Sequence, residues 1–179
     1  MQRLRKNIIL FAGCVSCMIS FALIVQACKV SYSMNGASIP PEAKTVSVAY
    51  FTNNTQLAPA TLSQQFTEAL KDICASQTKL ALVSKGGDLA FEGYISEYRT
   101  APLAIQTNDQ ASLTRLTISV QVKYTNKFDE KKNFETTFSR FGDFDSRKTV
   151  SSVEQDQAFM QSIYTQLTQD IFNKAFNNW

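Results

Sequence analysis

Hydrophobic and polar positions alternate most regularly between residues 115 and 124. The apolar positions are even-numbered: Leu116, Ile118, Val120, Val122 and Tyr124. The polar positions are odd-numbered: Arg115, Thr117, Ser119, Gln121 and Lys123. A period of two predicts a strand with one buried and one solvent-facing side. Residues 126–132 then predict a charged turn, and residues 133–142, rich in Phe, Thr and Ser, predict an antiparallel partner strand.

The same alternation predicts the register of this hairpin. Directly opposed residues share a face, so Phe134 and Phe138 are expected to meet the even-numbered apolar set. That parity also puts Arg140 on the core side near the strand end. There it either lies at an exposed rim or pairs with an acid.

Shorter patterns predict further strands at residues 30–34, 45–51, 80–83 and 89–98. Gly86 and Gly87 separate the last two of these, and they predict the tight turn of a hairpin or a slightly longer loop over residues 84–88.

The strand at 89–98 carries a glycine in its interior. Gly93 marks a bulge or a close approach of another backbone segment. Strict alternation puts Tyr98 on the polar face of this strand. Residues 99–111 are expected to form a loop or an irregular crossing.

Two segments have apolar residues at helical spacing. The first is capped by Thr61 and is apolar at Leu62, Phe66, Ala69, Leu70 and Ile73. The second starts at Ser151, where Glu154 can close a capping box, and its apolar stripe runs to Phe176 and Trp179. Two such helices cover only one face of a sheet. The fold expected is α+β, a two-layer sandwich with two amphipathic helices packed on one face of a mixed, mostly antiparallel sheet.

The first 28 residues have the parts of a secretory signal. Arg3, Arg5 and Lys6 precede an apolar run, and the run ends in Val25-Gln26-Ala27-Cys28. A Cys after a small residue resembles the lipobox of bacterial lipoproteins, in which the signal is cut before the Cys and that residue is acylated. This resemblance implies a signal peptide over residues 1–27 and a single domain over 28–179, lipidated at Cys28. The alternative is that the uncharged stretch 8–27 is retained as a transmembrane helix.

Composition narrows the classes of function. Three of the 18 basic residues and none of the 15 acidic ones lie in residues 1–27, so the remainder is neutral, which argues against nucleic-acid binding. The chain has no His, which excludes His-based triads, a haem with a proximal His and ordinary zinc sites. Cys74 is expected to be a small core residue.

An enzyme that uses carboxylates is the remaining catalytic possibility. The candidate acids are Asp88, Glu92, Asp143 and Asp145, which lie near strand ends. Carboxylates at such positions are usually solvated, so the chain is not expected to be an enzyme, and no cofactor or metal is expected.

Several segments together resemble the LptE-type lipopolysaccharide-assembly lipoproteins in their Bacteroidetes form. The segments are Cys28–Ser33, Gly36–Pro41, Lys44–Val48, Leu62–Asp72, Phe138–Phe141 and Asp170–Ala175. The resemblance implies an outer-membrane lipoprotein on the periplasmic side that partners and plugs a β-barrel translocon and contacts lipopolysaccharide. Family members often have Gly after the lipid-bearing Cys. Here it is Lys29, and the absence of Asp at that position favours delivery to the outer membrane.

Lipopolysaccharide phosphates would be bound by basic side chains. The candidates are Arg115 and Lys123 on the polar strand face, and Lys127, Lys131 and Lys132 in the turn. For the turn, the alternative is a solvated loop in which these lysines mix with Asp129 and Glu130. For the whole protein, the alternative is a lipid-anchored periplasmic ligand-binding lipoprotein without a barrel partner, which would need a deep apolar pocket between helices and sheet.

Overall fold

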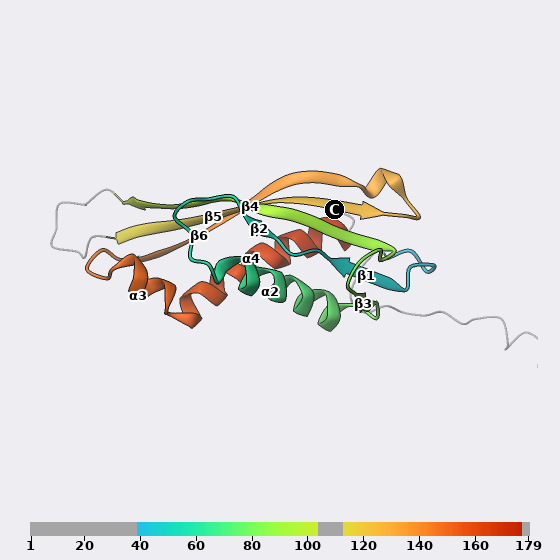
Figure 1. The fold of residues 1–179 in the computed structure, drawn as a ribbon, viewed down its shortest axis with the longest axis horizontal. Coiled ribbons are helices and arrows are strands. Elements are labelled where there is room, and N and C mark those ends of the chain that lie inside the picture. Colours follow the sequence, from blue (N-terminus) through green and yellow to red (C-terminus); the bar gives the residue numbers. More distant parts are fainter. Residues whose placement is uncertain (1–38, 104–112, 177–179) are drawn as a thin grey trace, which may run out of the picture. The chain divides into compact units, whose positions relative to one another are not determined.

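The computed structural model describes residues 39–103 and 113–176. Its elements are β1 (Thr45–Val48), β2 (Thr52–Asn53), α2 (Leu62–Gln77), β3 (Ala81–Val83), β4 (Leu89–Pro102), β5 (Leu113–Asn126), the 3₁₀ turn η1 (Glu130–Lys132), β6 (Phe134–Asp145), α3 (Val150–Glu154) and α4 (Gln157–Phe176). The strands form one mixed sheet, and the helices lie on one side of it (Figure 1). The α+β two-layer prediction is confirmed. The strand predicted at residues 30–34 lies outside the described residues, as do Cys28 and Trp179.

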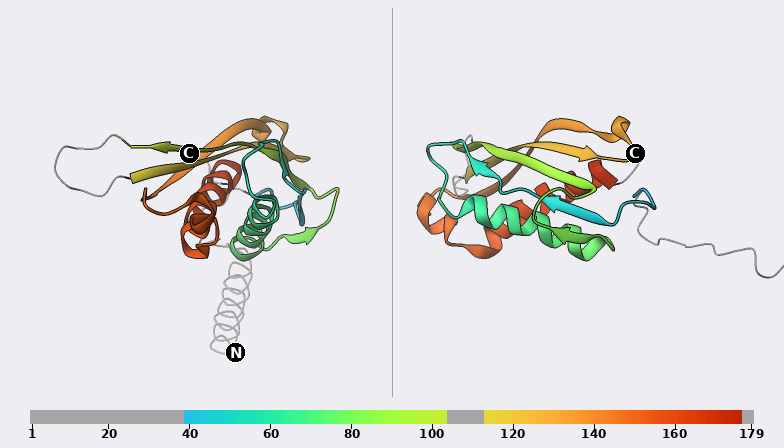
Figure 2. Two further views of the ribbon diagram at one scale, coloured as in Figure 1. Left: turned by 60° about the vertical axis from the view of Figure 1, so that its left-hand side comes forward. Right: turned by 45° about the vertical axis from the view of Figure 1, so that its right-hand side comes forward.

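The sheet joins a long antiparallel meander to short parallel strands. Its order is β3-β1-β4-β5-β6, and β2 pairs separately with β4. In the β5–β6 hairpin Val120 faces Phe138 and Tyr124 faces Phe134, which confirms the predicted register. The rings of Tyr124 and Phe134 stack with their centroids 5.3 Å apart. This hairpin and β4 carry most of the outer face, the side of the sheet away from the helices (Figure 2).

The predicted hairpin at Gly86-Gly87 is wrong. β3 and β4 do not pair with each other, because each lies parallel to β1 on one of its two sides. Residues 84–88 therefore pass across β1 as a longer loop, in which Gly86 adopts a left-handed φ of 70°. Nothing in the local sequence distinguishes this crossing from a hairpin, since β1 comes from far upstream.

The strand predicted at 89–98 is longer than expected and contains a bulge. Ile95 pairs with Val120 but Glu97 pairs with Ser119, so Ser96 is the extra residue. The bulge reverses the alternation and turns Tyr98 into the core, where it is 5% exposed, so its predicted place on the polar face is wrong. β4 continues to Pro102, so the first residues of the predicted 99–111 loop are strand, and the part from residue 104 on lies outside the described residues.

The strand β1 is shorter than predicted. β1 ends at Val48, so the strand predicted over 45–51 is too long. Tyr50 is 59% exposed, whereas Phe51 is fully buried and packs edge-on against Phe66 of α2 at 5.1 Å. The Gln121 carbonyl of β5 and the Phe51 ring both lie too close to Gly93 to admit a Cβ, and the Gln121 contact confirms the close backbone approach predicted at this glycine.

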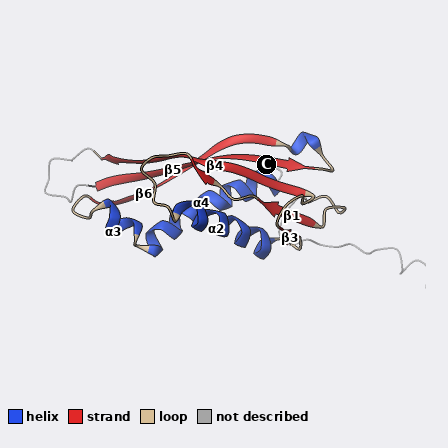
Figure 3. Ribbon diagram, in the orientation of Figure 1, coloured by secondary structure: helices blue, strands red, loops and turns tan. Residues whose placement is uncertain are grey.

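The two predicted helices pack on the sheet (Figure 3). Thr61 is the N-cap residue of α2, but its side chain makes no capping hydrogen bond. The second helix is divided into α3 and α4, and Thr149 caps α3 by accepting from the Ser152 N–H. The capping box predicted from Ser151 is therefore wrong. Glu154 instead accepts a 2.7 Å hydrogen bond from the Tyr98 hydroxyl, because the bulge brings that side chain to α3.

Candidate functional site

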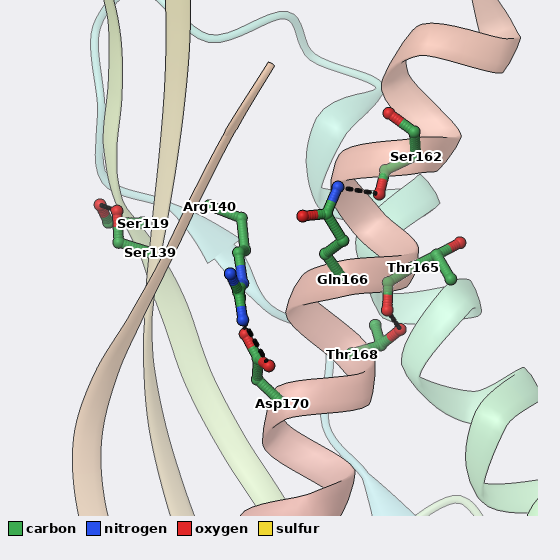
Figure 4. A network of polar contacts seen from close by, with 8 residues as sticks. All are labelled: Ser119, Ser139, Arg140, Ser162, Thr165, Gln166, Thr168 and Asp170. Carbon is green, nitrogen blue, oxygen red and sulfur yellow. Dashed lines mark hydrogen bonds and ion pairs between the residues drawn. The ribbon is translucent and has the colours of Figure 1, made fainter.

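The outer face of β4, β5 and β6 is a polar surface whose side chains bind one another. The Ser119 hydroxyl donates to Glu97 Oε2 at 2.8 Å and lies 3.0 Å from Ser139 Oγ on β6 (Figure 4). Glu97 also accepts from Arg99 Nε at 2.9 Å. The hydrogen bond from Ser119, followed by that from Arg99, holds the pKa of the Glu97 carboxyl below its usual range. The strands thus present a connected row of polar groups.

Arg115 is held in place at the far end of this face. Its guanidinium makes a two-pronged contact with Asp143, at 2.7 and 2.8 Å, and lies 3.6 Å from the centre of the Phe141 ring. These hydrogen bonds lower the pKa of Asp143. Phe141 is 48% exposed, so the stacked pair forms a surface of mixed charge and aromatic character.

Lys123 lies on the same face of β5, eight residues from Arg115, or about 26 Å along the strand. It stands opposite Glu92 and Glu135 but makes no ion pair within the described part of the chain. The structure therefore places these two predicted residues on one face but does not bring them together.

The three predicted turn lysines have different surroundings. Lys127 donates from Nζ to the Gly86 carbonyl at 2.9 Å and so ties the turn to the 84–88 loop. Lys131 is exposed in η1, whose first turn Asp129 caps. Lys132 is half-buried. The structural tie made by Lys127 was not predicted from the sequence, because its acceptor is a backbone carbonyl forty-one residues away.

Arg140 confirms the second of its two predicted alternatives. It pairs with Asp170 of α4 through two hydrogen bonds of 2.6 and 2.8 Å (Figure 4). The contact joins edge strand β6 to the helix that covers it. A charge pointing inward from an edge strand also opposes pairing with other chains.

The grooves formed by the described residues include one between α2 and α4 and one beside the 84–88 loop, and neither of these is an apolar pocket between helices and sheet. The larger, about 680 Å³, lies between α2 and α4 and is lined largely by glutamines and acids, among them Gln64, Glu68, Asp72, Gln157 and Gln161. The smaller, about 390 Å³, adjoins the 84–88 loop.

Other features bear on the class of protein. Cys74 is buried, and burial raises the pKa of its thiol to about 12, as expected for a core residue. Across residues 39–103 and 113–176, no cluster of three or more Cys, Asp or Glu side chains is arranged to hold a metal ion. None of the helices described in those ranges has the length and apolarity needed to cross a membrane.

A family model described as lipopolysaccharide-assembly, LptE, matches residues 43–175, which include the outer face, the turn and both helices. The chain belongs to the LptE family. This confirms the family identified from the sequence segments and assigns the chain to lipopolysaccharide assembly. Membership of an assembly family also agrees with the prediction that the chain is not an enzyme.

Several solved structures are similar to this LptE-family chain. Rare lipoprotein B from Shewanella oneidensis is 9% identical with a TM-score of 0.47, over 70% of this chain and 91% of that one. A minor lipoprotein from Acinetobacter baumannii is 16% identical with a TM-score of 0.44, over 74% and 91%. The hypothetical protein CT253 from Chlamydia trachomatis is 12% identical with a TM-score of 0.49, over 74% and 98%. No curated protein matches the chain.

Proposed function

We propose that this LptE-family chain is an outer-membrane lipoprotein, anchored by acylated Cys28 on the periplasmic side, that partners and plugs the β-barrel of lipopolysaccharide export. The family match supports assembly of lipopolysaccharide. The observation that carries the barrel contact is the outer face. A barrel lumen is polar, so its plug needs a polar surface with balanced charges rather than an apolar patch. The pairs Arg115–Asp143 and Arg99–Glu97 give the outer face that character.

Lipopolysaccharide contact belongs to the same proposal. Its phosphates accept charge-assisted hydrogen bonds from Arg115 and Lys123 on the outer face and from Lys127, Lys131 and Lys132 in the turn. Arg115 and Lys127 already have partners within the domain, so they bind phosphate only through their remaining N–H groups. Lys123 and Lys131 are exposed without an ion pair in the described residues, which makes them the better candidates for direct contact.

A ligand-binding lipoprotein without a barrel gains no support from the described residues. Both helices use their apolar stripes as core: Leu62, Phe66 and Leu70 of α2 and Ile163, Leu167 and Ile171 of α4 are at most 1% exposed. The groove between α2 and α4 is lined by polar and apolar groups in about equal measure, and it lies between two helices rather than between helices and sheet.

A pull-down tests the barrel contact. Tagged full chain is extracted in mild detergent and its partners are identified by mass spectrometry. A stoichiometric outer-membrane barrel of the lipopolysaccharide-export type is expected. Ser139→Arg, on the outer face, should reduce its recovery, whereas Thr165→Arg, exposed on α4, should not. Isolation of the chain as a monomer without a barrel contradicts the proposal, and loss of the barrel only with Thr165→Arg would move the contact to the helices. Thermal melts of both variants verify folding.

Cys28→Ala tests the anchor. The variant should be released from the outer membrane or mislocalised, since the acyl chains supply the stable attachment. Stable retention in the outer membrane would mean that barrel binding suffices or that the cleavage site lies elsewhere. Fractionation followed by mass analysis of the N-terminal peptide separates these two explanations.

A further inference from the structure

The basic side chains of the domain divide into two groups. One group is ion-paired: Lys71, Arg99, Arg115, Arg140, Arg147 and Lys148. The other group makes no ion pair within residues 39–103 and 113–176: Lys44, Lys79, Lys85, Lys123, Lys127, Lys131 and Lys174. A single surface lysine without an ion pair is common in proteins. This group is distinguished by where its members lie in the fold.

Five of these seven lysines belong to segments that meet where the described chain begins. Asp88 joins three segments there, because its carboxylate accepts the N–H groups of Lys44 and Thr45 at 2.9 and 3.0 Å, and its carbonyl accepts the Lys127 N–H at 3.1 Å. The Ala81 N–H donates to the Lys44 carbonyl at 2.8 Å, which brings the segment that carries Lys79 to the same place. We call this surface the lysine end and define it as Lys44, Lys79, Lys85, Lys127, Phe128 and Lys131. In Figure 1 the β5–β6 turn and the first described residues, in blue, lie together at this end.

The lysine end also includes an exposed apolar side chain. Phe128 is 47% exposed, and the Asn126 side chain fixes its backbone by accepting the N–H groups of residues 128 and 129. An aromatic ring flanked by lysines is suited to the boundary between lipid headgroups and acyl chains. The acids of these segments only partly offset the lysines. Asp88 and Asp129 are occupied by N–H groups, and Glu42 and Glu130 remain exposed.

The position of Cys28 fixes which end of the domain stays near a membrane. Residues 28–38 extend to at most about 38 Å. β5 alone is about 46 Å long, and the turn at its end belongs to the lysine end. For the opposite end of the sheet to lie at the bilayer, the tether would have to run back over about 46 Å, which is more than its extended length. The lysine end has no such requirement.

We propose that the lysine end docks on an anionic phospholipid bilayer, with its lysines against the headgroup phosphates and Phe128 in the interface. The inference rests on the proposed membrane anchoring of the N-terminal segment and adds to it the orientation of the domain. The acyl chains supply the attachment, and the basic patch adds an electrostatic contact that orients the domain on the anionic surface. Each lysine near an anionic surface adds about a fivefold gain in docking. Docking would thereby fix the orientation of the outer face relative to the membrane.

Tryptophan fluorescence in vesicles tests the docking with the full chain. Phe128→Trp places a reporter at the lysine end, and the wild-type chain, whose single tryptophan is Trp179, supplies the background. Vesicles contain brominated phosphatidylcholine, with or without phosphatidylglycerol. The new tryptophan should be quenched when phosphatidylglycerol is present, and much less without it. Leu57→Trp, 76% exposed beside the start of α2, is the control and should stay unquenched.

Charge reversal separates docking from mere proximity. In the Phe128→Trp background, Lys79→Glu, Lys85→Glu and Lys131→Glu together should lower the docked population by at least about a hundredfold, because three fivefold factors are lost and the new carboxylates are also repelled. Singly, Lys131→Glu should weaken quenching more than Lys123→Glu, an equal change in charge on the outer face. Equal quenching with and without phosphatidylglycerol, or stronger quenching of the tryptophan at 57 than of that at 128, would overturn the proposal. Quenching that requires lipopolysaccharide in the vesicle would also overturn it.

Flotation of the same samples distinguishes the two proposals. Chain that floats with the vesicles while the tryptophan at 128 stays unquenched overturns docking and leaves the anchor intact. If the chain does not float with the vesicles at all, the result contradicts the proposed anchor and the proposed docking together.

Discussion

A methyl group added at Gly93 should be among the most damaging single changes in the domain. A Cβ there would overlap the Gln121 carbonyl oxygen on β5 and lie 2.7 Å from Cε1 of Phe51. The first neighbour is backbone in the middle of the β4–β5 ladder, and the second is a fully buried ring. Overpacking a core by one methyl costs about 1–3 kcal/mol when side chains adjust. Because a carbonyl cannot rotate away, Gly93→Ala should cost about 3 kcal/mol, the upper part of that range.

Thermal unfolding followed by circular dichroism measures this effect. For a domain of this size, about 3 kcal/mol corresponds to a fall in Tm of roughly 10 °C. Gly86→Ala is the control, because a Cβ there meets nothing within 4 Å and only its left-handed φ of 70° is unfavourable, at about 1 kcal/mol. Adding Phe51→Ala to Gly93→Ala removes the ring but not the carbonyl and should restore no stability. A Gly93→Ala variant within about 1 kcal/mol of wild type would refute the steric argument, since without a clash alanine is favoured over glycine in a strand interior by about 0.5–1 kcal/mol.

Three further changes test other parts of the structure. Asp170→Asn should lower the free energy of unfolding by about 0.5–1 kcal/mol, and a double-mutant cycle with Arg140→Met should show the two losses to be non-additive, since the pair is two-pronged but partly exposed. Arg115 holds the pKa of Asp143 below its usual range, so the pair contributes stability above the ordinary aspartate pKa and loses it as pH falls through the lowered value. Asp143→Asn should therefore cost more near pH 6 than near pH 2 in urea titrations, and an equal cost at both would contradict this. Burial raises the pKa of Cys74 to about 12, so peptide mass analysis after alkylation near pH 8 should find it modified only under unfolding conditions, and rapid labelling of the native chain would show it to be accessible.

The features predicted correctly from the sequence are those governed by local periodicity. Ten alternating residues define β5, and the opposed residue rule then places Phe134 and Phe138 without further information. Helical spacing likewise identifies α2 and α4, whose apolar stripes are the buried faces. The alternation placed Arg140 on the core side and left two possibilities, an exposed rim or an ion pair with an acid. The sequence could not identify the partner, because Asp170 lies thirty residues away.

The errors arise where distant segments decide the structure. Gly86-Gly87 has the sequence of a hairpin turn, but β1 occupies the place between β3 and β4. The bulge at Ser96 depends on the pairing with β5, and it moves Tyr98 from the outer face to the core. The lysine end was not predicted from the sequence for the same reason. Lys44, Lys79 and Lys85 are far apart in sequence from the turn lysines, so their convergence follows only from the parallel pairing around β1.

The arrangement of charge gives the neutral domain two different surfaces. On the outer face Arg115 and Arg99 are matched to carboxylates within hydrogen-bond distance, and Lys123 stands opposite Glu92 and Glu135, so this surface has polar groups but little net field. At the lysine end the lysines make no ion pair in the described residues and the acids offset only part of their charge, so the remaining field extends into solvent over about 8 Å at physiological salt. A surface of the first kind suits a close-fitting polar wall, where an unpaired buried charge would be costly. A surface of the second kind suits a diffuse anionic layer, which needs no fixed geometry. In the proposed arrangement the second surface lies at the membrane, and the first extends from it along β4, β5 and β6.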